Sequence, residues 1–204
     1  MDEYIRQKIE KKDRMIEHGL DPYPSQAKEY TAIEKLISEF GETSREELSE
    51  KKQKFSIHGR LMTRRSLGKA GFYTIRDQDS QVQTYVKKAN LDEAGQTALE
   101  LMDIGDILRF TGWIGKSKVG ELTLFSDEIE ILSKSIQTLP EKHHGLTDKE
   151  LRYRNRHLDL IANPHRIEIF KLRSSISNPS NFVETNVVKS SSSTFLSIFS
   201  FMTS

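Results

Sequence analysis

The feature that most constrains the fold is a change in hydrophobic period that begins at Phe55 and lasts until about Leu132. On either side of this block, apolar residues recur at the three- or four-residue spacing of helices. Within it, apolar and polar residues alternate, which is typical of strands that bury one face only. We expect strands near 54–65, 71–77, 81–88, 106–117 and 121–132, and a helix at Ala94–Met102 between the third and fourth strands.

Five strands with a helix after the third follow the order of an OB-fold, a small Greek-key barrel whose second and third strands bind oligonucleotides. The fold class predicted is therefore mainly β with α (α+β), with helices before and after the barrel. Alternation places Phe72 and Gln83 together on the outer, polar face of two neighbouring strands. The residues predicted to fill the barrel are Phe55, Ile57, Ile75, Val82, Val86, Leu108, Phe110, Leu122 and Leu124.

The first strand does not fit strict alternation. Arg65 lies ten residues after Phe55, so a regular strand would turn both side chains to the same side. We predict a bulge or a bend at Gly59, because a glycine within a long barrel strand is often found at such an irregularity. A straight first strand would count against a binding role for Arg65.

Basic and aromatic side chains are concentrated between Gly59 and Val86. Cations neutralise phosphates and a flat ring stacks on an unpaired base, so this combination favours a single-stranded nucleic-acid site. The whole chain has 31 basic and 30 acidic residues, so attraction for a nucleic acid must come from such local clustering. The cations are Arg60, Arg64, Arg65 and Lys69, and the rings are Phe72 and Tyr73.

Other chemistry is poorly supported by the sequence. The absence of cysteine excludes a disulfide framework, a thiolate zinc site and a cysteine nucleophile. His143 and His144 are adjacent and point in different directions, so no metal site is supported, and we interpret His58 as structural. Trp113 is the only tryptophan, and we favour barrel packing over base stacking for it. The charged N-terminus lacks a signal-peptide core, so we expect a cytoplasmic location and no membrane contact.

Three helices are predicted before the barrel. The first buries Ile5, Ile9 and Ile16 and stops at Gly19; its Lys8, Lys11, Lys12 and Arg14 form a face interpreted as solvated rather than RNA-bound. The second and third begin at capping boxes, in which a hydroxyl caps the helix and an acid follows three residues later. These boxes are Thr31 with Glu34 and Ser44 with Glu47, and the second helix turns Ile33, Leu36, Ile37 and Phe40 inward.

Helix signals return after the barrel. Thr147 and Glu150 form a third capping box, and Asn163 with Pro164 starts a further helix. Arg152, Arg154 and Arg156 either contact RNA or pair with acids of a subunit interface; the pattern leaves both open. A buried face is predicted for Ile167, Phe170 and Ile176.

Several motifs closely resemble class II lysyl-tRNA synthetase from its N-terminal anticodon-binding domain onward. They are GRLMTRRSLGKAGFYTIRD at 59–77, VQTYV at 82–86, Gly120-Glu121, and KHHGLTDKELRYRNRHLDLIANP at 142–164. The resemblance implies that Arg65, Phe72, Gln83 and Glu121 read the anticodon of lysine tRNA. Phe72 would stack on a base, Gln83 and Glu121 would pair with a uracil edge, and Arg65 would donate to carbonyls. Arg60, Arg64 and Lys69 would bind phosphate.

The resemblance implies N-terminal helices at 1–53, an OB-fold anticodon-binding domain at 54–136, a linker and the start of a catalytic domain at 137–177, and a divergent tail at 178–204. The family uses ATP and Mg²⁺ and forms a homodimer through motif 1. Motifs 2 and 3 have no counterpart here, so we expect a truncated or frameshifted product that binds neither cofactor and is inactive alone. A stand-alone tRNA-binding module and a generic single-strand binder are the alternatives.

Overall fold

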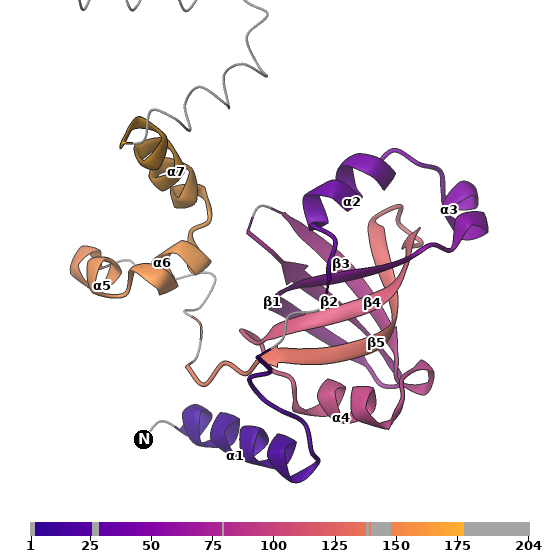
Figure 1. Ribbon diagram of the computed structural model, residues 1–204, viewed down its shortest axis with the longest axis horizontal. Coiled ribbons are helices and arrows are strands. Elements are labelled where there is room, and N and C mark those ends of the chain that lie inside the picture. The colour runs from indigo at the N-terminus through magenta and orange to yellow at the C-terminus, as the bar shows by residue number, and fades with distance from the viewer. Residues whose placement is uncertain (1–2, 26–28, 79, 138, 140–147, 178–204) are drawn as a thin grey trace, which may run out of the picture. The chain divides into compact units, whose positions relative to one another are not determined.

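The computed structural model describes residues 3–25, 29–78, 80–137, 139 and 148–177 (Figure 1). Contacts divide the chain into two units, Met1–Thr138 and Leu139–Ser204. The predicted tail, Thr147 and the two adjacent histidines lie outside the described residues.

The first unit is a closed five-stranded barrel with the strand order β1-β2-β3-β5-β4, in which β4 pairs with β1 (Figure 1). β3 and β5 are parallel, and all other neighbours are antiparallel. The OB-fold prediction is confirmed. The strands are β1 (Lys54–Leu67), β2 (Ala70–Arg76), β3 (Gln81–Lys87), β4 (Ile107–Lys116) and β5 (Leu122–Ser133); a short 3-10 turn, η1 (Lys88–Asn90), and helix α4 (Glu93–Leu101) follow β3.

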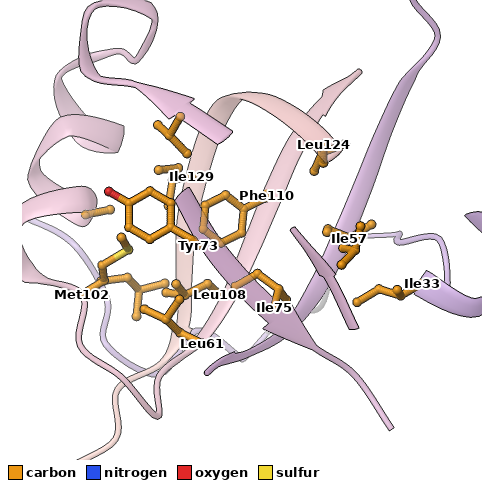
Figure 2. Packing of buried hydrophobic residues seen from close by; sticks show 14 of the residues in the cluster. Ile33, Ile57, Leu61, Tyr73, Ile75, Met102, Leu108, Phe110, Leu124 and Ile129 are labelled. Carbon is orange, nitrogen blue, oxygen red and sulfur yellow. The ribbon is translucent and has the colours of Figure 1, made fainter. Parts of the chain in front are cut away.

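The barrel core is close to the predicted one. Every predicted interior residue is buried except Phe55 and Leu122, which are half-buried and pack against the same core. Tyr73 joins the core as well, with its ring 6.3 Å from the ring of Phe110 (Figure 2). Of the two neighbouring aromatics in the basic segment, only Phe72 is therefore left on the outer face.

The irregularity of β1 lies three residues beyond the predicted glycine. Leu61 pairs with Ile75 but Thr63 pairs with Thr74, so the bulge is at Met62. It has the predicted effect, because Arg65 becomes the direct partner of Phe72.

Gly59 itself pairs regularly with Leu108, so the prediction of a bulge at this glycine is wrong. The glycine is needed for a close approach: a Cβ here would lie 2.5 Å from the carbonyl oxygen of Arg76.

The N-terminal helices are α1 (Glu3–Glu17), α2 (Ile33–Phe40) and α3 (Arg45–Lys51). The cap predicted for α3 is confirmed, since Ser44 Oγ accepts from Glu47 N at 3.3 Å. The cap predicted for α2 at Thr31 is wrong. That helix begins after Ala32, which makes no side-chain bond, and the N–H of Ile33 donates instead to Asp77 Oδ2 at 2.9 Å.

The basic face of α1 is not simply solvated, which corrects the prediction. Lys8 is buried and donates to the carbonyl oxygens of Ile104 and Gln137, each at 3.3 Å, and Lys11 pairs with Asp103. Burial lowers the pKa of Lys8, although nearby acids oppose this shift.

The apolar face of α1 also differs from the expected one. Met15 is buried, whereas the predicted Ile16 is 56% exposed. In α2, Ile33, Leu36 and Phe40 face inward, but Ile37 is exposed.

The second unit contains α5 (Lys149–Arg154), α6 (Arg156–Ala162) and α7 (His165–Ser177). Asp148 caps α5 by accepting from Leu151 N at 2.7 Å, and α7 starts directly after Pro164 as predicted. The buried face predicted for α7 is wrong for this chain: Phe170 and Ile176 are exposed, the latter by 68%.

The sequence left three arginines of this unit open between RNA and acidic partners, namely Arg152, Arg154 and Arg156. Arg154 pairs with Glu150 at 2.7 Å, on the exposed surface. Arg156 pairs with the buried Asp159 at 2.9 Å and lies over the ring of Phe170. Two of the three arginines therefore have acidic partners within their own unit.

Candidate nucleic-acid interface

A groove of about 960 Å³ lies on the outer face of the barrel, where residues of all five strands line it, and it extends to the turn between β4 and β5. All four residues predicted to read an anticodon line it: Arg65, Phe72, Gln83 and Glu121. The structure thus brings together side chains from the end of β1, from β2, from β3 and from the turn after β4.

Phe72 is held in place by its neighbours rather than buried by them. It is the direct cross-strand partner of Arg65 on one side and of Tyr85 on the other. Its ring lies 4.9 Å from the ring of Tyr85, tilted by 45°. A half-buried ring that is supported from one side can offer its other side to a base. Arg65, the neighbour of Phe72 on β1, lies beside that base position.

The amide of Gln83 is engaged at both ends. Its Nε2 donates to Glu121 Oε2 at 2.8 Å, and its Oε1 accepts from the buried Thr123 Oγ1 at 3.3 Å. Glu121 follows Gly120, whose φ of 85° allows a tight turn between β4 and β5. The N–H of Glu121 donates to Ser117 Oγ at 3.1 Å. An oriented amide and a carboxylate side by side offer donors and acceptors to the polar edge of one base.

The interpretation of Trp113 as barrel packing is wrong. Its half-buried side chain lies on the outer face and lines the groove, with its ring 6.3 Å from Phe125 and nearly parallel to it. Alternation counted from the buried Phe110 predicts this outward position, so the signal was present in the sequence. Tyr85 and Phe125 are the other groove aromatics that sequence reasoning did not assign to the site.

The predicted phosphate-binding residues lie elsewhere. Arg60 donates to the carbonyl oxygen of Gly105 and Arg64 to that of Met102, each at 2.7 Å, and burial lowers the pKa of Arg60. Neither residue lines the groove, and neither does the exposed Lys69. The groove has other cations near it, namely Arg45, Lys87, Lys116 and Lys118.

The described residues, 3–25, 29–78, 80–137, 139 and 148–177, give no support to a metal site or a membrane-spanning helix. Within them, no three histidine or acidic side chains are grouped closely enough to hold a metal ion, and no helix has the length and apolar character to cross a membrane. The ring of His58 stacks on Tyr30 at 3.5 Å, and burial lowers the histidine's pKa.

Comparison with known proteins matches this geometry. The family model of the OB-fold nucleic acid binding domain fits residues 55–132. A lysine–tRNA ligase of Bacillus cereus (strain AH187) is 42% identical over 167 residues, which are 82% of this chain and 34% of that protein. Over most of its length, this chain is similar to one part of lysine–tRNA ligases.

Two further relatives support the same relationship. The lysine–tRNA ligase of Bacillus subtilis (strain 168) is 36% identical over 86% of this chain and 35% of its own length. That of Oceanobacillus iheyensis is 41% identical over 81% of this chain and 34% of its own length. The chain therefore spans about a third of the length of these ligases.

Proposed function

We propose that this chain binds the anticodon loop of lysine tRNA in the groove, as the recognition part of a lysine–tRNA ligase that acts in the cytoplasm. The observation that carries the proposal is the convergence of Arg65, Phe72, Gln83 and Glu121 from separate elements onto one surface. Phe72 stacks on one uracil, and the Gln83 amide and the Glu121 carboxylate form hydrogen bonds with the edge of that base.

We assign no residue of this chain to the ligation step. In the family, lysine is activated with ATP and Mg²⁺, and we assign no residue of this chain to the binding of either. A homodimer is part of the proposal and is supported by apolar side chains that α7 leaves exposed, Ile169, Leu172 and Ile176 among them. Arg60, Arg64 and Lys69 stay predicted phosphate contacts, although the groove favours Lys87, Lys116 and Lys118 for this role.

The proposal is tested by replacing Phe72 with alanine. We expect Phe72→Ala to weaken binding of a labelled lysine anticodon stem-loop by about 1–3 kcal/mol, the usual loss for one base–aromatic stack. Fluorescence anisotropy measures the affinity. Tyr23→Ala is the matched control, because Tyr23 is an exposed aromatic that does not line the groove.

A second stem-loop separates anticodon recognition from general single-strand binding. Replacing the central uridine of the anticodon by cytidine changes the polar edge that Gln83 and Glu121 face. We expect weaker binding of this loop by the parent chain. Equal affinity for both loops would show a generic binder, and an unchanged affinity in Phe72→Ala would remove that residue from the site.

A further inference from the structure

The groove continues well beyond the residues used by the proposed function. Phe72, Tyr85, Phe125 and Trp113 are successive cross-strand partners on β2, β3, β5 and β4, so they form one row across the barrel. Each ring contacts the next, at centroid distances of 4.9, 5.7 and 6.3 Å. Only the Phe72 end of this row is needed to stack a single anticodon base.

The Trp113 end of the row has the geometry of a stacking surface. The rings of Trp113 and Phe125 are nearly parallel, with an interplanar angle of 11°, and both line the groove. Gly115 makes room for the Phe125 ring, because a Cβ at this position would lie 2.8 Å from that ring. Tyr85 separates the two ends, since it meets Phe125 edge-on at 68°.

The charge beside this end fits a nucleic-acid strand. Lys116 and Lys118 line the groove at the end of β4 and in the turn that follows. Among the ion pairs of the described residues, none involves Lys116 or Lys118, so both amine groups are available to a phosphate. Aromatic rings next to unpaired cations favour RNA over an apolar peptide as the occupant.

The spacing decides which part of the RNA reaches this end. Three strand spacings of about 4.8 Å separate Phe72 from Trp113, or about 14 Å along the sheet. A base stacked on Phe72 therefore leaves the rings of Trp113 and Phe125 uncovered. A neighbouring nucleotide of the same RNA can reach them.

We propose that Trp113 and Phe125 form a second stacking site, which takes the base of a nucleotide flanking the one on Phe72, with Lys116 and Lys118 at its phosphate. The proposal rests on the proposed function for the position of the first base. It extends the recognised RNA from one stacked nucleotide to a short single-stranded segment.

The single tryptophan makes the site directly observable, because all tryptophan fluorescence of the chain comes from Trp113. The full chain is titrated with the lysine anticodon stem-loop, and then with loops in which one nucleotide at a time keeps its phosphate but lacks its base. We expect the intact loop to quench the fluorescence. One abasic loop, altered at a flanking position, should abolish the quenching and bind about 5- to 150-fold more weakly.

A double-mutant cycle between the abasic loop and a protein variant tests whether the flanking base interacts with the Trp113 ring. Trp113→Leu should weaken binding of the intact loop by a similar factor in anisotropy, and the abasic loop should then cause little further loss. Trp113→Phe keeps an aromatic ring and should retain most of the affinity. Circular dichroism shows whether each variant keeps the barrel.

The lysines give an independent measurement. Replacing Lys116 and Lys118 by glutamine should reduce the slope of log affinity against log salt by about 0.7 for each lysine. Lys35, an exposed lysine of α2 outside the groove, provides the matched glutamine control.

The outcomes separate this inference from the proposed function. If Phe72→Ala weakens binding but the fluorescence and the Trp113→Leu affinity do not change, the second site is overturned and the proposed function stands. If Trp113→Leu weakens binding and Phe72→Ala does not, the second site stands without the first. If neither substitution changes the affinity, both are wrong.

Discussion

Lys134 has the position least expected from its chemistry. It follows β5 directly, and its side chain is fully buried although it ends in an amine group. Its Nζ donates to the carbonyl oxygen of Leu101 at 2.7 Å, to Asp103 at 2.8 Å and to Asp106 at 2.7 Å. A buried ammonium is tolerated only with such partners, and here they join the end of β5 to the loop before β4.

Removing this ammonium should therefore cost much more than removing an exposed one. We expect Lys134→Met to lower the free energy of unfolding by about 3–5 kcal/mol, because the fully buried Asp106 loses its ion-pair partner. Lys54→Met, at an exposed ion pair with Asp127, should change it little. Urea denaturation measures both, and equal effects would contradict the role given to Lys134.

Asp103 makes the stability depend on pH on the acid side. Burial alone would raise the pKa of Asp103, but hydrogen bonds from Lys11 and Lys134 outweigh it and hold the pKa below its usual value. A lowered pKa in the folded state adds stability above the unfolded value, and this contribution is lost as pH falls below about 4. Asp103→Asn should flatten that part of the curve of melting temperature against pH. Glu42→Gln, at an exposed carboxylate, is the control.

At the scale of elements, helix ends and strand registers follow contacts between distant segments. The start of α2 shows this most directly: Asp77, 44 positions further along the chain, accepts from Ile33 N. The other oxygen of this carboxylate accepts from Ser80 N at 2.8 Å and so shapes the connection between β2 and β3. One side chain therefore stabilises a helix start and a strand connection together.

The corrected cap gives a test at this scale. We expect Asp77→Ala to lower the free energy of unfolding by about 1–2 kcal/mol, because the first N–H of α2 loses its acceptor. Thr31→Ala should be close to neutral, since Thr31 does not cap the helix. Hydrogen exchange at the α2 amides, together with urea denaturation, measures the difference. A larger loss in Thr31→Ala would restore the cap predicted from the sequence.

At the scale of the whole molecule, the two units differ in how they bury apolar surface. The core cluster lies entirely within residues 15–131. In the described helices of the second unit, by contrast, the only buried side chain is that of Asp159. The first unit thus has a core of its own, whereas the second shows none in its described helices.

A fragment ending at residue 138 should therefore keep the barrel. We expect residues 1–138 to unfold cooperatively, with a thermal midpoint close to that of the barrel transition in the full chain, and to bind the anticodon stem-loop with similar affinity. Residues 139–204 alone should show no cooperative transition, because α5, α6 and α7 bury no apolar side chain. Calorimetry and circular dichroism test both fragments. A fragment 1–138 without a transition would show that its core depends on the second unit.

The sequence by itself determined the strands, the inserted helix, most of the barrel interior and, through family motifs, a set of site residues that share one groove. These follow from alternation and from motifs, which are properties of neighbouring residues. Tertiary structure alone decided that the bulge lies at Met62, that Lys134 is buried, that Arg60 and Arg64 bond to backbone carbonyls, and that Trp113 continues the row from Phe72. Each of these depends on which distant segment lies opposite, and the pairing of β3 with β5 brings that row together only when the barrel closes.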